Sequence, residues 1–331
     1  MGQPTKNISK KKAIITGITG QDAAYLSQFL LSKEYRVIGV YRESVYSDFS
    51  RLIYLGVLEA VELIPCDLTN PESCKALIRD YQPDEVYNLA AQSSVSFSFS
   101  HPRETLEFNI ISVLNLLEAI RSTNPKVKFY QASSSEMYGK VDQLPIRNTT
   151  QLHPISPYGI SKATSHWMVN QYREAYGLFA ACGILFNHES YLRPDSFFVK
   201  KVIKSAIRIK LGLQETLSVG NIDIKRDFGL ASEYVKAIWM IMQLKEPYDF
   251  QVCSGASVSL RSIVYYVFDT LGLDHEQVVH DQTLYRPAEI LDMYGDRTEI
   301  EQRTGWKYSL TFFDALDILI IEELENILHE E

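Results

Sequence analysis

Short apolar runs alternate with helical patterns along the first half of the chain. Residues 13–16 form an apolar run that stops at Gly17, which is typical of a buried strand. Apolar side chains then recur at helical spacing over 21–33, and a second apolar run rich in valine and isoleucine occupies 36–41. This order of strand, helix and strand predicts a βαβ unit.

The alternation continues to about residue 187 and then loosens. Further strands are predicted at 61–65, 85–90, 128–132 and 180–186, and helices at 71–81, 104–122, 157–176, 197–211, 231–244, 259–271 and 311–328. Strands alternating with helices predict an α/β fold with a Rossmann-type, doubly wound parallel sheet. We expect this sheet domain to span mainly 11–187 and a smaller mixed α/β substrate-binding lobe to span mainly 188–331, with the chain crossing back to the sheet near 220–250.

The composition narrows the class of partner. Of 331 residues, 46% are hydrophobic and 22% charged, and no apolar run approaches the roughly 18 residues that a membrane helix needs. Lysine and arginine number 33 against 41 aspartate and glutamate, so the net charge is 33 − 41 = −8. We expect no membrane partner and no nucleic-acid partner, and an anionic ligand must be held by local groups.

The cysteines and the first residues bear on the compartment. Cys66, Cys74, Cys182 and Cys253 are scattered without a Cys-x-x-Cys pair, which argues against a disulfide framework or a zinc site. Residues 1–6 contain no apolar segment of a targeting peptide. We therefore expect a cytoplasmic protein without a metal.

A glycine-rich turn joins the first strand to its helix. It reads Gly17-Ile18-Thr19-Gly20-Gln21-Asp22-Ala23, and such a turn lets backbone amides approach a pyrophosphate at a helix N-terminus. Ala23 stands at the third glycine position, which needs only close helix packing. The turn predicts a dinucleotide site, although the same pattern also occurs in plain turns.

The ends of the next two strands bear on the cofactor. Arg42 follows the second strand where an acidic residue would bind a ribose 2′-hydroxyl, and a guanidinium suits a 2′-phosphate, hence NADP rather than NAD. Glu43 beside it leaves open a plain surface pair. Asp67 and Leu68 could flank an adenine, or Asp67 could cap the next helix.

Candidate catalytic groups follow the fifth strand and open a later helix. Tyr158 and Lys162 have i, i+4 spacing, so the ammonium can stabilise a phenolate on the same helix face. Ser134 can hydrogen-bond a substrate hydroxyl, and Glu136 can take a proton from a carbon beside a ketone. A helix cap with Glu136 as its capping-box partner is the alternative for this segment.

These residues carry a resemblance. Thr16-Gly17-x-x-Gly20, Asn88-Leu89-Ala90-Ala91, Ser134 and Tyr158-x-x-x-Lys162 resemble the extended short-chain dehydrogenase/reductase superfamily. More narrowly, the chain from about 12 to 306 resembles the GDP-mannose 4,6-dehydratase family. The segments that carry this are Gly17 to Asp22, Tyr87 to Ser93, Phe129 to Ser133, Ser135 to Met137, Ser156 to Gly159, Gly183 to Ser190, Lys225 to Asp227 and Tyr285 to Glu289.

The resemblance implies a hydro-lyase reaction on a GDP-linked sugar. Tyr158 would take the C4 hydroxyl proton as hydride leaves C4, with Lys162 lowering the phenol pKa and Ser134 orienting the hydroxyl. Glu136 would then take the C5 proton, water would leave C6 and the hydride would return there. Because NADP is regenerated in each turnover, it is expected to stay tightly bound.

The resemblance also assigns binding residues. The cofactor contacts are Gly17, Thr19, Gly20, Gln21, Asp22, Arg42, Asp67, Leu68, Leu89, Ala90, Tyr158, Lys162, His188 and Arg193. The substrate contacts are Ser93, Glu136, Asn187, Lys201, Arg226, Arg286 and Glu289. Arginines suit the two phosphates, although Arg226 could instead pair with Asp227 at the surface, and His188 could be a core residue.

Several departures from the family fall around the expected sugar pocket. The family has Pro-Arg-Arg-Gly where this chain has Tyr191-Leu192-Arg193-Pro194, and Val-Thr-Arg-Lys at 198–201, here Phe-Val-Lys-Lys. The resemblance implies GDP-mannose as the substrate and GDP-4-keto-6-deoxymannose as the product, and these departures leave GDP-linked manno-heptose and N-acetylglucosamine as alternatives. Glu43 replaces an arginine of a subunit-bridging loop, so a homodimer is expected more firmly than a homotetramer.

Two other functions compete with the dehydratase. A nucleotide-sugar reductase or epimerase of the same superfamily would use Tyr158 and Lys162 but would not need a base at C5, so Glu136 discriminates against it. A non-catalytic NADP-binding regulator would need none of the side chains of Tyr158, Lys162 and Glu136.

Overall fold

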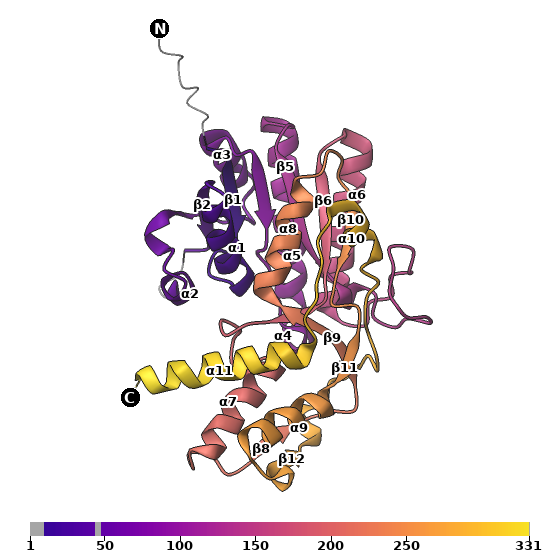
Figure 1. Ribbon diagram of the computed structural model, residues 1–331. Coiled ribbons are helices and arrows are strands. Elements are labelled where there is room, and N and C mark those ends of the chain that lie inside the picture. The colour runs from indigo at the N-terminus through magenta and orange to yellow at the C-terminus, as the bar shows by residue number, and fades with distance from the viewer. Residues whose placement is uncertain (1–9, 44–47, 331) are drawn as a thin grey trace.

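A seven-stranded parallel sheet forms the centre of the computed structural model, which describes residues 10–43 and 48–330 (Figure 1). Residues 1–6, predicted above to carry no targeting segment, lie outside this range. The strand order is β10-β6-β5-β4-β1-β2-β3. The strands are β1 (Lys12–Thr16), β2 (Arg36–Tyr41), β3 (Val61–Pro65), β4 (Glu85–Asn88), β5 (Lys128–Ser134), β6 (Ala180–Leu185) and β10 (Asp249–Val252). The direction of winding reverses between β1 and β4, where such sheets bind ligands.

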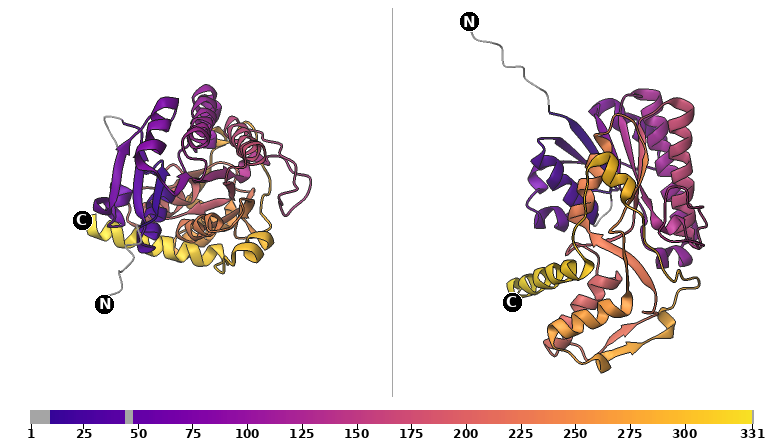
Figure 2. Two further views of the ribbon diagram at one scale, coloured as in Figure 1. Left: turned by 90° about the horizontal axis from the view of Figure 1, so that it is seen from above. Right: turned by 45° about the vertical axis from the view of Figure 1, so that its right-hand side comes forward.

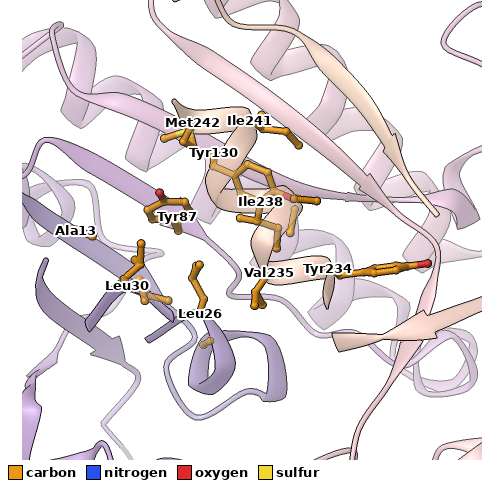
Figure 3. Close-up of a cluster of buried hydrophobic side chains, with 14 of the residues drawn as sticks. Ala13, Leu26, Leu30, Tyr87, Tyr130, Tyr234, Val235, Ile238, Ile241 and Met242 are labelled. Atoms are coloured by element: carbon orange, nitrogen blue, oxygen red, sulfur yellow. The ribbon is translucent and has the colours of Figure 1, made fainter. Parts of the chain in front are cut away.

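Helices cover both faces of the sheet. One face carries α1 (Gln21–Ser32) and α8 (Ala231–Met242), and the other carries α3 (Pro71–Tyr81), α5 (Pro102–Thr123) and α6 (Pro157–Tyr176). Neighbouring strand residues point to opposite faces, so Ala13 and Ile15 pack toward α1 and α8 while Ile14 packs toward α3 and α5. Figure 3 shows the first of these cores, with Leu26 of α1 facing Val235 of α8.

This architecture confirms the predicted Rossmann-type sheet. The predicted helices and strands agree with the observed bounds to within a few residues, and β5 runs two residues further, to Ser134. The pattern missed the edge strand β10 and three helices, α2 (Ser50–Tyr54), α4 (Val95–Ser100) and α10 (Thr298–Thr304). Each of these helices has two turns or fewer, which is too short for a helical period to emerge.

A smaller lobe lies beyond the carboxyl edge of the sheet (Figure 2). It contains α7 (Phe198–Lys210), α9 (Leu260–Leu271) and α11 (Phe312–Glu330), which share one apolar core. Two small sheets complete it, one with order β11-β9-β7 and one pairing β12 with β8. Their strands are β7 (Asn187–Glu189), β8 (Leu217–Val219), β9 (Lys225–Leu230), β11 (Ser257–Ser259) and β12 (Val278–His280). Between β9 and β11 the chain returns to the main sheet as α8 and β10.

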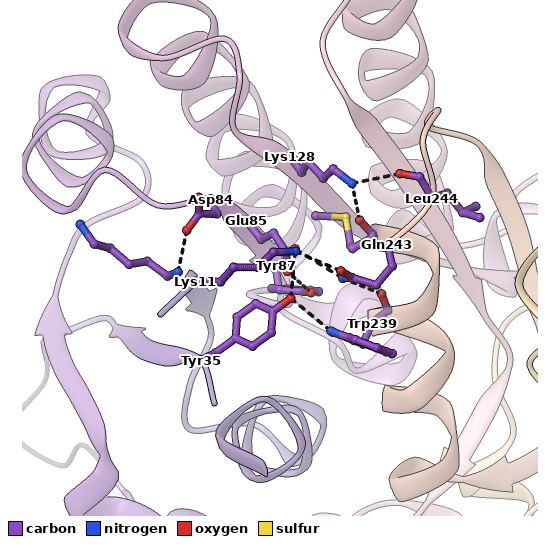
Figure 4. Close-up of polar contacts among 11 residues, drawn as sticks. Lys11, Tyr35, Asp84, Glu85, Tyr87, Lys128, Trp239, Gln243 and Leu244 are labelled. Atoms are coloured by element: carbon purple, nitrogen blue, oxygen red, sulfur yellow. Dashed lines mark hydrogen bonds and ion pairs between the residues drawn. The ribbon is translucent and has the colours of Figure 1, made fainter. Parts of the chain in front are cut away.

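A polar network fastens α8 at the amino edge of the sheet, away from the ligand-binding edge (Figure 4). The buried carboxylate of Glu85 accepts hydrogen bonds from Lys11 (3.2 Å), Tyr35 (3.2 Å) and Gln243 (3.4 Å). Lys128 Nζ donates to the carbonyl of Met242, the last residue of α8 at the negative end of the helix dipole, and to that of Leu244 just beyond it. These contacts fix α8 against the sheet. None of the described helices is both long and apolar enough to cross a bilayer.

Candidate active site

The glycine turn after β1 has the backbone that a pyrophosphate-binding loop requires. Gly17 has a φ of +68°, and a Cβ built there would lie 2.8 Å from Ala90 Cα. Gly20 N–H donates to Gly17 O at 2.9 Å, and Thr16 Oγ1 accepts the N–H groups of Leu89 and Ala90 at 3.2 Å each. The turn is thus held close to the end of β4 at the N-terminus of α1, which fits the phosphates of a dinucleotide.

A cavity of about 650 Å³ opens at this edge of the sheet and gathers most of the predicted site residues. Its lining includes Gly17, Thr19, Gly20, Gln21, Asp22, Leu89, Ala90, Ser93, Ser134, Glu136, Tyr158, Lys162, Asn187, His188, Arg193, Lys201, Arg226 and Arg286. Arg42, Asp67 and Leu68 lie instead in two adjoining cavities. Glu289 stands behind the arginines.

The start of α6 positions two of the candidate catalytic groups. Ser156 caps the helix, its Oγ accepting the Gly159 N–H at 3.0 Å. Tyr158 and Lys162 then follow one turn apart, and Lys162 Nζ lies 5.7 Å from the centre of the Tyr158 ring. Lys162 Nζ donates to Ala132 O at 2.9 Å, which ties α6 to β5 beside Ser134.

Ser134 and Glu136 lie where β5 ends, on the same wall as Tyr158. Ser134 hydrogen-bonds Tyr158, and its Oγ also accepts the Glu136 N–H at 3.3 Å. The alternative is confirmed in part, because Ser134 caps the short helix 135–137, but Glu136 occupies its second position and is not a capping-box partner. The partly exposed Glu136 is therefore left to face the cavity.

Burial dominates the proton affinities on this wall. It raises the pKa of Tyr158 to about 12, although the bond from Ser134 lowers it. It also lowers the pKa of Lys162 to about 8, against the raising effect of Asp22 and Cys182. The net shift of the phenol pKa in this arrangement is therefore upward, because burial is the largest cause, and the Lys162 ammonium is bonded to Ala132 O.

His188 joins the glycine turn to the smaller lobe. Its Nδ1 lies 2.7 Å from Phe186 O and its Nε2 lies 2.8 Å from the Asp22 carboxylate, so both ring nitrogens face acceptors, and against the lowering effect of burial Asp22 raises the pKa of His188. Burial alone would raise the pKa of Asp22, but His188 outweighs it and the pKa falls to about 2. His188 is thus both well satisfied and part of the cavity wall.

Arginines and a carboxylate form the opposite wall. The buried Arg226 donates to Ile290 O at 2.7 Å and to Glu289 Oε1 at 3.1 Å, and Arg286 lies 3.9 Å from the same oxygen. Glu289 therefore orients both arginines toward the cavity. The alternative pairing of Arg226 with Asp227 is wrong, since the Asp227 carboxylate accepts backbone N–H groups of residues 254, 255 and 295 instead.

The remaining predicted substrate contacts have local partners. Asn187 donates to Asp227 O at 3.2 Å, and Lys201 donates to Ser218 O at 2.8 Å. Ser93 is exposed at the cavity rim.

The adjoining cavities suit the adenosine end of a dinucleotide. Arg42 and Glu43 line one cavity of about 700 Å³ together with Asp67, and Arg42 and Leu68 line another of about 320 Å³ that shares Gly17 with the main cavity. The helix-cap alternative for Asp67 is wrong, because Asn70 caps α3. Asp67 instead accepts the N–H and hydroxyl of Thr69.

Of the two segments that depart from the family, 191–194 and 198–201, only some side chains face the expected sugar pocket. Tyr191 stacks on Tyr54 of α2 with ring centres 4.7 Å apart, and Lys200 Nζ donates to Tyr191 O at 2.7 Å. Lys200 also forms a buried ion pair with Glu323 of α11, and Tyr54 donates to Glu322 at 2.8 Å. We call these five residues the α2–α11 clasp. The Tyr191 side chain thus enters a contact between the lobes, although the sequence comparison placed it around the expected sugar pocket.

Sequence patterns missed Arg51 of α2. Its Nε donates to Leu192 O at 2.8 Å and its NH1 to Thr19 O at 3.0 Å, and it lines the main cavity. A lone arginine in an unpredicted helix gives no local signal of this role.

One group of described residues has metal-ligand chemistry. Donor atoms of His166, Cys182 and Asp249 lie within 4.8 Å of one another behind the catalytic wall. Asp249 is already paired with Arg173, and the His166 nitrogens contact Ser133 and Asn170. Asp249 and His166 are therefore engaged by protein partners.

The fold and the Tyr158–Lys162 wall define an extended short-chain dehydrogenase/reductase that binds a nicotinamide cofactor. A family model described as GDP-mannose 4,6 dehydratase matches residues 14–319. The chain belongs to the GDP-mannose 4,6-dehydratase family.

Known GDP-mannose 4,6-dehydratases match this chain over nearly its full length. GDP-mannose 4,6 dehydratase 2 of Arabidopsis thaliana is 42% identical, covering 96% of this chain and 87% of its own. The Homo sapiens GDP-mannose 4,6 dehydratase is 38% identical, covering 98% and 93%. RMD from Pseudomonas aeruginosa, solved with NADPH, has a TM-score of 0.77 and 27% identity over 94% of this chain and 98% of its own. The dTDP-glucose 4,6-dehydratase DesIV from Streptomyces venezuelae, solved with NAD, has a TM-score of 0.84 and 20% identity over 95% and 97%, which shows the same fold.

Proposed function

We propose that this protein is a nucleotide-sugar 4,6-dehydratase that converts GDP-mannose to GDP-4-keto-6-deoxymannose and water. The observation that carries the proposal is one continuous cavity with Tyr158 and Lys162 on one wall, Glu136 beside them and Arg226 opposite. A reductase or epimerase needs the first pair, but only a dehydratase needs a carboxylate base at C5.

The side chains divide the work as follows. Ser134 and Tyr158 hold the 4-hydroxyl, and Tyr158 takes its proton while Lys162 stabilises the phenolate. A bound oxidised nicotinamide supplies a reversible hydride acceptor and a positive charge that favours the phenolate. Glu136 takes the C5 proton made acidic by the 4-ketone, and the hydroxyl at C6 leaves as water. C4 is oxidised and C6 is reduced, so the reaction needs no external reductant.

The cofactor is proposed to be NADP, held tightly through each turnover. Arg42 supports this, since it lines both adenosine-side cavities and its permanent charge suits a 2′-phosphate. Asp22 and His188 support retention, because their buried ion pair links the glycine turn to the smaller lobe over the same cavity.

A homo-oligomer is part of the proposal. Ile111 of α5 and Ile160 and Trp167 of α6 are exposed by 38%, 44% and 56%. Two such helices can pair with those of a second copy as a four-helix bundle, which supports at least a dimer.

Mass spectrometry tests the reaction directly. The protein with NADP and GDP-mannose, without reductant, should yield a product lighter by one water, about 18 Da. Glu136→Gln should block water loss but still permit oxidation at C4, while Glu246→Gln, an exposed carboxylate, should behave like the wild type. Unchanged dehydration by Glu136→Gln would refute the assigned base. Water loss only from GDP-manno-heptose or GDP-N-acetylglucosamine would keep the reaction and change the sugar.

A further inference from the structure

Two cysteines that are eight residues apart in the sequence meet beside the adenosine-side cavities. Cys66 directly follows β3, where its N–H donates to Tyr41 O at 2.9 Å. Cys74 lies in the first turns of α3 and its Sγ lies 3.5 Å from Leu68 O. Cys66 packs against the apolar cluster that contains Cys74, and each thiol shifts the pKa of the other. The loop that carries Asp67 and Leu68 is therefore bracketed by a thiol pair.

The pair is asymmetric in exposure. Cys66 is partly exposed and lines both cavities that contain Arg42, whereas Cys74 is fully buried behind it. The other two cysteines, Cys182 and Cys253, are fully buried elsewhere in the fold. Only Cys66 of the four can meet a reagent that enters the cofactor site.

The pair is also asymmetric in acidity. The hydrogen bond from Cys74 lowers the pKa of the Cys66 thiol, and the same bond, with burial, raises the pKa of Cys74. The accessible sulfur is thus the better thiolate, and the buried sulfur is placed to resolve what forms on it.

We propose that Cys66 and Cys74 form an oxidation site in the cofactor cavity, which reacts with a low-molecular-weight disulfide of the glutathione type and closes to a Cys66–Cys74 disulfide. The Cys66 thiolate attacks one sulfur of the reagent and releases one thiol. Cys74 loses its proton, attacks Cys66 Sγ and releases the second thiol. Two protein thiols are oxidised and one reagent disulfide is reduced to two thiols.

The disulfide acts on the cofactor through the loop between the two sulfurs. Drawing Cys74 Sγ toward Cys66 breaks its contact with Leu68 O and shifts Asp67 and Leu68, which line the adjoining cavities. Cofactor affinity should fall in the oxidised form. This consequence rests on the proposed function, because it places the adenosine of NADP in those cavities.

Oxidised glutathione is the probe for a test on the full chain. The folded protein should lose about 2 Da on treatment, and digestion should link the peptides that hold the two cysteines. Bound NADP should slow the reaction by at least about tenfold, since it covers Cys66. NADP should dissociate from the oxidised form with a Kd at least about tenfold higher, and dithiothreitol should restore the original value.

Variants separate attack from resolution. Cys74→Ser should stop at the mixed disulfide, a gain of about 305 Da on Cys66, and Cys66→Ser should not react. The matched control Cys182→Ser should oxidise like the wild type. Lasting glutathione on wild-type Cys66, no reaction of the folded protein, or an unchanged NADP Kd after oxidation would each overturn the proposal.

Assays of the reduced protein distinguish a failure of the thiol proposal from a failure of the proposed function. If it dehydrates GDP-mannose yet forms no disulfide, only the thiol inference fails. If the disulfide forms but the reduced protein neither binds NADP nor dehydrates, the proposed function fails, and the effect on the cofactor fails with it.

Discussion

Replacing Lys162 with methionine should stabilise the fold while abolishing the reaction. Burial lowers the pKa of Lys162 from 10.5 to about 8, and this difference corresponds to about 3 kcal/mol spent on keeping the ammonium charged at neutral pH. Methionine fills the same space without a charge. The lost hydrogen bond to Ala132 O offsets about 1 kcal/mol, so Lys162→Met should raise the free energy of unfolding by about 2 kcal/mol.

The gain in the free energy of unfolding from Lys162→Met should depend on pH in a defined direction. Below pH 8 the lysine is protonated in both folded and unfolded chains, so its full cost is present. Between pH 8 and 10.5 the folded protein releases the proton and the unfolded chain retains it, so wild-type stability rises with pH. The advantage of the variant should therefore be largest at neutral pH and shrink above pH 8.

Urea unfolding at neutral pH and at about one unit above the pKa of Lys162, without added nucleotide, measures both effects. Nucleotide is omitted because NADP would stabilise the wild type by mass action. Lys126→Met, at an exposed lysine, is the matched control and should change little. Dehydration should fall by about 10²- to 10⁴-fold. A variant less stable than the wild type, or a gain independent of pH, would refute the reasoning.

Three further outcomes are expected. Arg42→Ala should raise the Kd of NADP by about tenfold while leaving that of NAD nearly unchanged, by cofactor titration; an equal loss for both would remove Arg42 from the 2′-phosphate. Glu323→Gln should destabilise the protein by about 3–5 kcal/mol because Lys200 stays charged and buried, and adding Lys200→Met should restore much of the loss in urea unfolding. Trp167→Glu should shift the protein to a monomer in light scattering, and a wild-type monomer would contradict the oligomer.

The sequence could predict those parts of the site that a strand end or one helix face brings together. Parallel strands all end at one edge, so Gly17 after β1 and Ser134 at the end of β5 had to meet there. Tyr158 and Lys162 share a helix face by their spacing alone. Their grouping in one cavity therefore follows from local patterns plus the choice of a parallel sheet.

Other features depend on contacts between distant segments, for which a single sequence carries no signal. Glu289 lies 63 residues from Arg226 yet binds it directly. Arg51 reaches Leu192 across 141 residues. Because Asp227 is adjacent to Arg226 in the sequence, the two could be expected to pair. In the structure the Asp227 carboxylate instead accepts backbone N–H groups of another loop. In each case the tertiary fold determines which of several chemically equivalent groups becomes the hydrogen-bond partner.

The residues that depart from the family fall into two groups according to what their side chains contact. Tyr191 and Lys200 turn to Tyr54 and Glu323 in the α2–α11 clasp, whereas Pro194 and Phe198 line the main cavity. The first group joins α2, whose Arg51 holds the glycine turn through Thr19 O, to α11 of the smaller lobe. Those changes therefore act on how firmly the lobes hold the cofactor. Only the second group can act on the sugar, so the choice among GDP-linked sugars rests on fewer side chains than the sequence comparison implies.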